Sequence, residues 1–98
     1  MFEKGRRKGT TRFAVKPEGA ARAVAVAGDF SAWKPLGMRR QKDGVFVLNV
    51  PTAKASFEYK FLIDGTWVTD PDNPHMAPDP FGTFNSVVPE DADAVMRL

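Results

Sequence analysis

The stretch "SFEYKFLIDGTWVT", residues 56–69, decides the fold. An Asp-Gly pair, Asp64 and Gly65, separates two runs rich in aromatic and aliphatic residues. Asp-Gly between such runs is the strongest short-range signal for a β-hairpin, because a type I′ turn needs positive φ at both central residues. We therefore predict two antiparallel strands, over residues 56–63 and 66–69, joined by a two-residue turn.

A turn of two residues also fixes which residues of the two strands lie opposite one another. The predicted pairs are Ile63 with Thr66, Leu62 with Trp67, Phe61 with Val68, and Lys60 with Thr69. Side chains alternate between the two faces of a strand, so this register predicts the content of each face.

One face of the hairpin is apolar and is predicted to be core; it gathers Phe57, Tyr59, Phe61, Ile63 and Val68. The other face meets water, because it carries Glu58 and Lys60 together with Leu62 and Trp67. Trp67 is thus predicted to point outward, diagonal to Lys60 and within reach of its long side chain. The alternative is that the proline-rich loop after Trp67 covers it.

The rest of the chain repeats short β-rich runs separated by turns, without sustained helical periodicity. We expect an all-β fold, an immunoglobulin-like β-sandwich of about seven strands. Val24 and Val26 would share a core face, Phe30 would be a buried partner of the loop 31–37, and a loop would cover 71–80. The predicted strands are 10–17, 22–30, 38–41, 45–50, 56–63, 66–69 and 84–88.

The bulk composition fits one small globular domain. The chain has 98 residues, of which 43% are hydrophobic, and no cysteine, which excludes disulfides and thiolate metal sites. The start "MFEKGRRKGTTRF" does not read as a signal peptide, and no run approaches the length of a membrane span. We expect a cytoplasmic protein without a membrane partner.

Positive charge is concentrated at the start of the chain. Residues 1–16 contain six Lys and Arg against one Glu, whereas the whole chain has a net charge of +2. We predict a flexible basic tail over 1–9, a β-sandwich module over 10–89 and a tail or short helix over 90–98. Nucleic-acid binding needs cations along a groove or face, so we do not expect a nucleic-acid partner.

Metal and catalytic interpretations of the acidic residues are weak. Asp70, Asp72 and Asp79 lack the glycine and glutamate of a dedicated calcium loop, and Asp-Pro pairs are ordinary turn formers. The single histidine, His75, has no partner at catalytic spacing. Glycosidases need two carboxylates about 5–10 Å apart across a cleft, and an open sheet with Glu58 and Asp64 offers no such cleft. We expect no catalytic residue, no metal and no cofactor.

An exposed indole beside a lysine is typical of a recognition surface. A flat apolar ring suits the C–H faces of a sugar, and nearby amide, hydroxyl and ammonium groups bond sugar hydroxyls. One cation among neutral polar groups favours a neutral polyhydroxylated ligand over an acidic one.

Three stretches carry a resemblance to a known family: "VAGDFSAWKP" (26–35), "EYKFLIDGTWVTDPDNP" (58–74) and "PFGTFNSVV" (80–88). Together they resemble the glycogen-binding domain of the AMP-activated protein kinase β subunit. More broadly, they are similar to carbohydrate-binding module family 48, the early-set β-sandwich at the N-termini of isoamylases and branching enzymes. The resemblance covers roughly residues 10 to 88, and the ordered set of motifs is more specific than any one of them.

The resemblance implies six carbohydrate-binding residues in this sequence. Two are the platforms Trp33 and Trp67, and one is Lys60 of the "YKF" strand. The others lie in one loop: Phe81, Thr83 and Asn85. The chain departs from the family at Ser31, where asparagine is common, and at Phe81, where leucine is usual. Phe81 is therefore interpreted either as a glucan contact or as a core residue.

The resemblance implies a non-catalytic module that binds α-1,4-glucans such as glycogen, starch and maltooligosaccharides. The alternative is a protein-interaction or regulatory module of a glucan-processing enzyme or kinase complex, in which sugar binding is secondary. Both a standalone protein and a module of a larger enzyme fit the sequence.

Overall fold

The computed structural model describes residues 1–52, 54 and 56–89, and these form ten strands and one 3-10 turn. None of their helical structure is long and apolar enough to cross a membrane. The elements are β1 (Phe2–Lys4), β2 (Thr10–Val15), β3 (Val24–Gly28), η1 (Asp29–Ser31), β4 (Leu36–Gly37), β5 (Arg39–Arg40), β6 (Phe46–Pro51), β7 (Phe57–Ile63), β8 (Thr66–Val68), β9 (Met76–Pro78) and β10 (Phe84–Val88).

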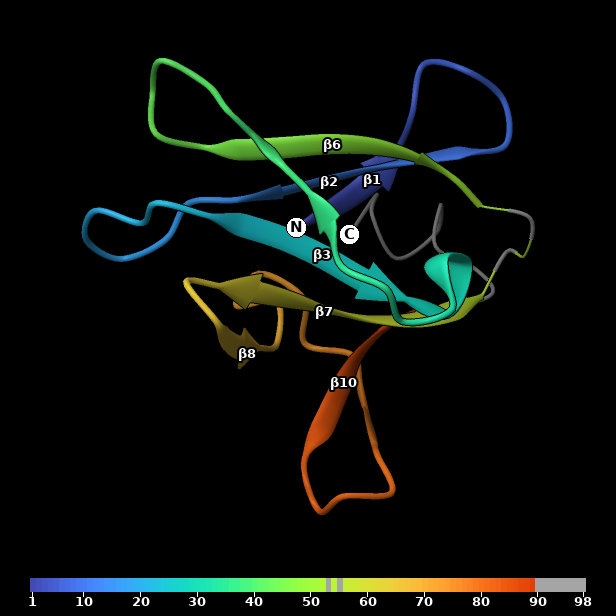
Figure 1. Cartoon of the computed structure of the whole chain (residues 1–98). Helices are drawn as coiled ribbons and strands as arrows, with labels where there is room; N and C mark the ends of the chain where they lie inside the picture. The colour runs from blue at the N-terminus through green and yellow to red at the C-terminus, as the bar shows by residue number, and fades with distance from the viewer. Residues whose placement is uncertain (53, 55, 90–98) are drawn as a thin grey trace.

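The strands form two antiparallel sheets that lie face to face (Figure 1). The four-stranded sheet has the order β1-β2-β6-β5. The six-stranded sheet has the order β4-β3-β7-β10-β9, and β8 also pairs with β7. The predicted all-β sandwich of early-set type is confirmed, with three more strands than the seven expected.

The hairpin of β7 and β8 has the predicted register. Ile63 pairs with Thr66, Leu62 with Trp67 and Phe61 with Val68. Asp64 and Gly65 have φ of 48° and 85°, both positive as a type I′ turn requires. The Asp64 carboxylate also accepts the backbone N–H groups of Arg22 and Ala23, at 2.9 and 2.8 Å. Asp64 therefore ties the turn to the start of β3 and has a structural role.

The core face of β7 is the predicted one at Phe57, Tyr59 and Phe61, but not at its far end. Ile63 is only half-buried, and Val68, which was expected to share the core face, is half-buried and lines the pocket described below. Phe57, Tyr59 and Phe61 are buried, and Val24 and Val26 of the neighbouring β3 join them. Phe30, which was expected to be buried, is only half-buried, but it packs against this core: its ring stacks on Phe13 at 5.3 Å and meets Phe57 edge-on at 5.5 Å.

Three segments that were expected to be irregular contain strands. Phe2 is buried and pairs with Phe13, so residues 2–4 of the expected flexible tail form β1 instead. The prediction was wrong because a single apolar residue within a highly charged stretch gives no strand pattern. The expected proline-rich loop over 71–80 contains β9, which ends at Pro78. Proline is tolerated there because β9 is the last strand of its sheet and an edge needs fewer N–H donors. The short β4 lies within the expected loop 31–37.

The other domain limits, 10–89 for the module and 90–98 for the tail, stay predictions. Residues 90–98 lie outside the described residues.

A buried polar network fixes the segment that leads from β8 to β9. The Tyr59 hydroxyl donates to Asp70 at 2.7 Å and accepts from the Asn73 amide at 3.0 Å. The Asp70 N–H donates to the Ser86 hydroxyl at 2.8 Å, and the amino group of Met1 forms an ion pair with the Asp70 carboxylate. Burial, with the Asp70 charge beside it, raises the pKa of Tyr59 far above its ordinary value. Asp70 is thus a structural group, not part of a calcium cluster.

Replacing Tyr59 by Phe should lower the free energy of unfolding by about 1–3 kcal/mol at pH 7, because buried Asp70 and Asn73 each lose a partner. Urea denaturation measures this.

The pH dependence tests the same contact. Native Tyr59 keeps its proton while the unfolded tyrosine ionises near pH 10, so the contribution is complete below pH 10 and is lost as the pH rises toward the native pKa. Tyr59 is the only tyrosine. The stability difference between parent and Tyr59→Phe should therefore shrink by about 1.4 kcal/mol per pH unit above 10. A difference that stays constant up to pH 11 would contradict this.

Candidate functional site

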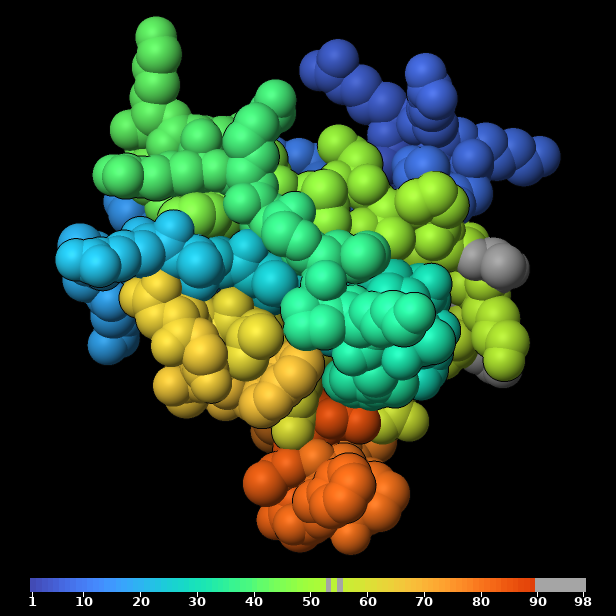
Figure 2. Space-filling view, in the orientation of Figure 1, coloured from blue at the N-terminus to red at the C-terminus, as the bar shows by residue number. Residues whose placement is uncertain are grey.

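A pocket lies on the outer side of the six-stranded sheet, around the β9–β10 hairpin. This hairpin projects from the body of the molecule in the space-filling view (Figure 2). All six residues expected to form a site line the pocket: Trp33, Lys60, Trp67, Phe81, Thr83 and Asn85. Residues from four separate parts of the chain thus meet at one place.

The tip of the hairpin is held by one carboxylate. Asp79 Oδ1 accepts the backbone N–H groups of Phe81 and Thr83, both at 2.9 Å. Its Oδ2 accepts the Thr83 hydroxyl and the Lys60 ammonium, the latter at 3.0 Å. The Thr83 hydroxyl and N–H, followed by Lys60 and Phe81, hold the pKa of the Asp79 carboxyl well below its ordinary range. We call Lys60, Asp79 and Thr83 the clamp.

The clamp orients Lys60 and leaves it donor capacity. Its ammonium donates to Asp79 and, at 2.9 Å, to the Thr83 hydroxyl. An ammonium has three N–H donors, so one remains for a ligand. The clamp also holds Phe81 outward at the tip, where 89% of the side chain is exposed. The interpretation of Phe81 as a core residue is therefore wrong.

Trp33 follows η1 and is held by both its backbone and its ring. Gly28 must lack a side chain, because a Cβ there would collide with the Glu58 carbonyl and lie 2.8 Å from the Phe30 ring. Trp33 has φ of 62°, an uncommon conformation for a bulky residue. Its indole N–H donates to Asp29 Oδ1 at 3.1 Å, while Asp29 Oδ2 accepts the Glu58 N–H at 2.9 Å. Trp33 is half-buried, and Asp29 links its ring to the backbone of β7.

Ser31, which stands where the family often has asparagine, supports this turn. Its hydroxyl accepts the Gly28 N–H and contacts the Gly28 carbonyl oxygen, both at 3.2 Å. The departure from the family pattern thus leaves a side chain that still closes the loop before Trp33.

Trp67 and Asn85 complete the set from opposite sides of the hairpin. Trp67 is 47% exposed, so the loop that follows it does not cover it. Asn85 is buried, and its amide donates to Glu58 Oε1 at 3.0 Å. Asn85 lines the pocket with a side-chain amide that Glu58 already orients.

Sequence reasoning did not assign to the site the other residues that line the pocket, among them Asp29, Glu58, Met76, Asp79 and Phe84. Asp79 looked like an ordinary residue of an Asp-Pro turn. The alternation in "FNSVV" predicts that Phe84 shares a side with Ser86 and not with the expected site residue Asn85, so it gave no signal that Phe84 lines the pocket.

The pocket has the chemistry of a binding site for an uncharged polar ligand. It offers two indoles, two phenyl rings, one ammonium and several oriented oxygen and nitrogen atoms. Among the described residues, no group of His, Cys, Asp or Glu could hold a metal ion. Glu58 and Asp64 are six positions apart on one extended strand, about 20 Å, which is too far for a glycosidase pair.

Replacing Asp79 by Asn should loosen the tip of the hairpin. The Asp79 carboxylate accepts four hydrogen bonds through two oxygens, whereas an amide has only one acceptor oxygen and places an NH2 donor where the second oxygen was. The amide protons of Phe81 and Thr83 should exchange with solvent faster than in the parent, as measured by NMR. Glu18→Gln, which removes an exposed carboxylate remote in sequence from the hairpin, should leave both rates unchanged.

The titration of Asp79 tests the same clamp. Its lowered pKa means that its stabilising effect is present above the unfolded value near 3.9 and is lost only as the pH falls toward the native value. The side-chain carboxyl carbon of Asp79 should therefore titrate below pH 3.9. A midpoint at or above that value would show that the clamp is not formed in solution.

Several known proteins are similar to this chain. A family model described as the glycogen recognition site of AMP-activated protein kinase matches residues 11–94. The β-1 subunit of 5'-AMP-activated protein kinase from Sus scrofa is 32% identical over 71 residues, which are 71% of this chain and 56% of that protein. The β-2 subunit from Mus musculus is 34% identical over 68 residues, which are 66% of this chain and 24% of that protein.

A solved structure is similar as well. The crystal structure of a putative α-amylase from Salmonella typhimurium superposes with a TM-score of 0.68 at 26% identity, covering 88% of this chain and 14% of that one. This chain thus spans about half of the pig β-1 protein and much smaller parts of the mouse and Salmonella proteins. Since the family model covers most of the chain, the resemblance inferred from the motifs is confirmed, and the chain belongs to the family of the glycogen recognition site of AMP-activated protein kinase.

Proposed function

We propose that this chain is a non-catalytic carbohydrate-binding module that recognises α-1,4-glucans such as glycogen, starch and maltooligosaccharides. The observation that carries the proposal is the convergence of Trp33, Lys60, Trp67 and the Phe81–Asn85 loop on one pocket, in a chain of a glycogen-recognition family.

The chemistry of the pocket suits glucose units in a chain. The indoles of Trp33 and Trp67 take the C–H faces of the sugar rings, and Phe81 makes an apolar contact at the tip. The remaining N–H of Lys60 donates to a sugar hydroxyl, while Thr83 and Asn85 offer further polar atoms. Water competes for every hydroxyl, so the affinity of such an open site is modest.

The carboxylates of the pocket already have partners, which supports a binding function over hydrolysis. Asp29 bonds the Trp33 indole, Glu58 bonds Asn85, and Asp79 bonds Lys60 and Thr83. Each of the three carboxylates therefore positions a neighbouring protein group, and no two of them form an unpartnered acid and nucleophile pair of the kind that hydrolysis needs. The similarity to the putative α-amylase covers only 14% of that protein, as expected for a module separate from a catalytic domain.

Partners of the chain belong to the proposal too. The relatives are named as subunits of a kinase, and this chain spans only part of each. We propose that it serves as the glucan-binding part of a larger assembly, with a kinase or a glucan-processing enzyme as its neighbour. A purely protein-binding module is less favoured, because it would not need two tryptophans, a lysine and an exposed loop at one pocket. A cytoplasmic location stays a prediction.

Trp33→Ala and Trp67→Ala should each weaken binding of maltoheptaose by about tenfold or more, which corresponds to about 1.4 kcal/mol. Isothermal titration calorimetry gives the affinities, and glycogen in a native gel should retard the parent more than either variant. Lys34→Ala, which changes an exposed neighbour of Trp33 outside the pocket lining, serves as the control. The parent affinity should change little with salt, because the ligand is neutral.

The proposal fails if both tryptophan variants, still folded by circular dichroism, bind maltoheptaose and glycogen as tightly as the parent. A protein partner that remains bound after amylase treatment, together with no glucan affinity, would favour the protein-interaction alternative.

A further inference from the structure

The exposed apolar side chains of the molecule gather at the pocket. Among the described residues, five large hydrophobic side chains are exposed: Met1, Trp67, Met76, Phe81 and Phe84. Four of them line the pocket. The proposed function accounts for Trp67 and Phe81, but it assigns nothing to Met76 and Phe84, which are 54% and 51% exposed.

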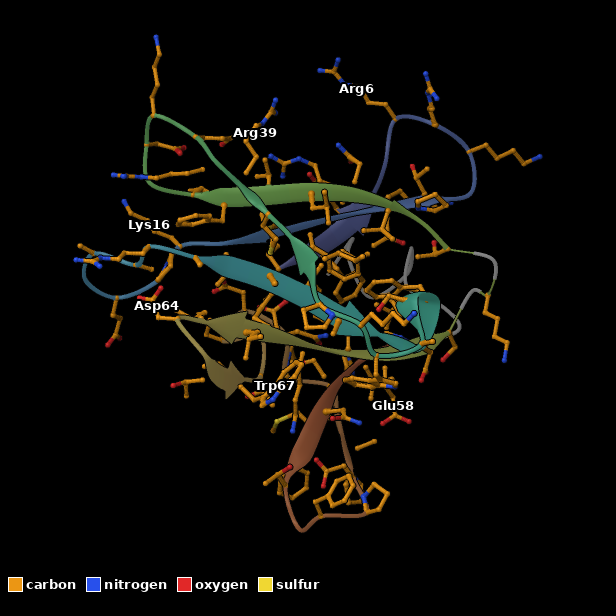
Figure 3. All side chains as sticks on the ribbon, in the orientation of Figure 1. Arg6, Lys16, Arg39, Glu58, Asp64 and Trp67 are labelled. Atoms are coloured by element: carbon orange, nitrogen blue, oxygen red, sulfur yellow. The ribbon has the colours of Figure 1, made fainter. Side chains whose placement is uncertain are left out.

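The β9–β10 hairpin separates the pocket into two sides. Asn85 points to one side, because its amide bonds Glu58. Ser86 points to the other side, because its hydroxyl accepts the N–H of Asp70, which follows β8 closely in the chain. Side chains alternate along a strand, so Phe84 lies on the same side as Ser86. In Figure 3 the labelled Trp67 and Glu58 lie on opposite sides of the projecting hairpin.

The register of the hairpin adds two residues to the side of Phe84. Phe84 pairs with Pro78, and Ser86 pairs with Met76. Residues directly opposite one another share a face, so Met76, Pro78 and Phe84 form one apolar surface on the side of β8. We call Trp67, Met76, Pro78 and Phe84 the aromatic strip.

The two sides differ in chemistry. The side of Glu58 carries the carboxylates of Asp29 and Glu58 and the amide of Asn85 beside Trp33. The aromatic strip carries no charged group. An exposed apolar surface on a small protein marks a binding site, and all four residues of the aromatic strip line the proposed glucan pocket.

We propose that Phe84, supported by Met76, is a further glucan-contacting residue, and that the aromatic strip binds additional α-linked glucose units on the β8 side of the hairpin. This inference rests on the proposed function and extends it. The C–H face of a glucose ring packs on the Phe84 ring, and the flexible Met76 side chain fills the contact beside it. The site thereby prefers long α-glucan chains, which reach both sides of the hairpin, over short ones.

The experiment compares chain lengths on the full chain. Phe84→Ala should weaken binding of maltoheptaose by about three- to tenfold, and should weaken binding of maltotriose by clearly less, as measured by calorimetry. Phe84→Leu, which keeps apolar bulk without a ring, should lie between the parent and Phe84→Ala. Lys34→Ala is the control outside the pocket. Intermolecular NOEs between Phe84 ring protons and maltoheptaose protons should appear in the parent.

The outcomes separate this inference from the proposed function. If the parent does not bind maltoheptaose, both fail. If Trp67→Ala weakens binding but Phe84→Ala matches the parent, or lowers affinity for both sugars equally without NOEs to Phe84, only the aromatic strip is overturned. Should Phe84→Ala fail to fold, the comparison of Phe84→Leu with the parent and the NOEs decide between the same two results.

Discussion

The alternation of side chains along β7 is the constraint on which both the core and the site depend. β7 pairs with β3 on one side, and with β8 and β10 on the other. Its odd-numbered residues Phe57, Tyr59 and Phe61 are buried, while Glu58 and Lys60 line the pocket. A slip of one residue in its register would place Lys60 in the core and Tyr59 in water. The Asp64–Gly65 turn excludes such a slip, because its two positive φ angles permit only one pairing.

The site itself is ordered by carboxylates that act on other side chains. Asp29 bonds the indole of Trp33 and the backbone of β7, and Asp79 bonds Lys60 and the tip of the hairpin. Each carboxylate therefore accepts hydrogen bonds from protein donors and so positions a group that a ligand would contact. Side chains that are ordered before binding lose less conformational entropy on binding, which matters most where each contact with a neutral sugar is weak.

The sequence alone predicts the parts of this protein that depend on local rules. The turn at Asp64 and Gly65 and the alternation on 56–63 led to the correct register and to an outward Trp67. The resemblance then added Trp33 and the Phe81–Asn85 loop, and the pocket contains all of them.

The parts that sequence reasoning missed depend on contacts between distant segments. β1 is held by Phe2 within a highly charged stretch, and β9 lies among prolines that normally end strands. The clamp needs Asp79 to meet Lys60 across nineteen positions of the chain. Such pairings leave no periodic signal, because they join segments that are distant in the chain. The clamp depends in addition on how β10 turns away from the sheet beyond Ser86.

That turn of β10 explains how one small sandwich can hold both a packed core and an exposed aromatic surface. Ser86 is fully buried and bonded to Asp70, whose carboxylate accepts the Tyr59 hydroxyl, so β10 is anchored in the core at this point. Two residues earlier, Phe84 is half exposed. The same alternation that would place Phe84 in the core, had β10 continued along the sheet, instead presents it beside the pocket. The buried network thus stabilises the fold and sets the direction in which the hairpin, and every residue it carries, leaves the sheet.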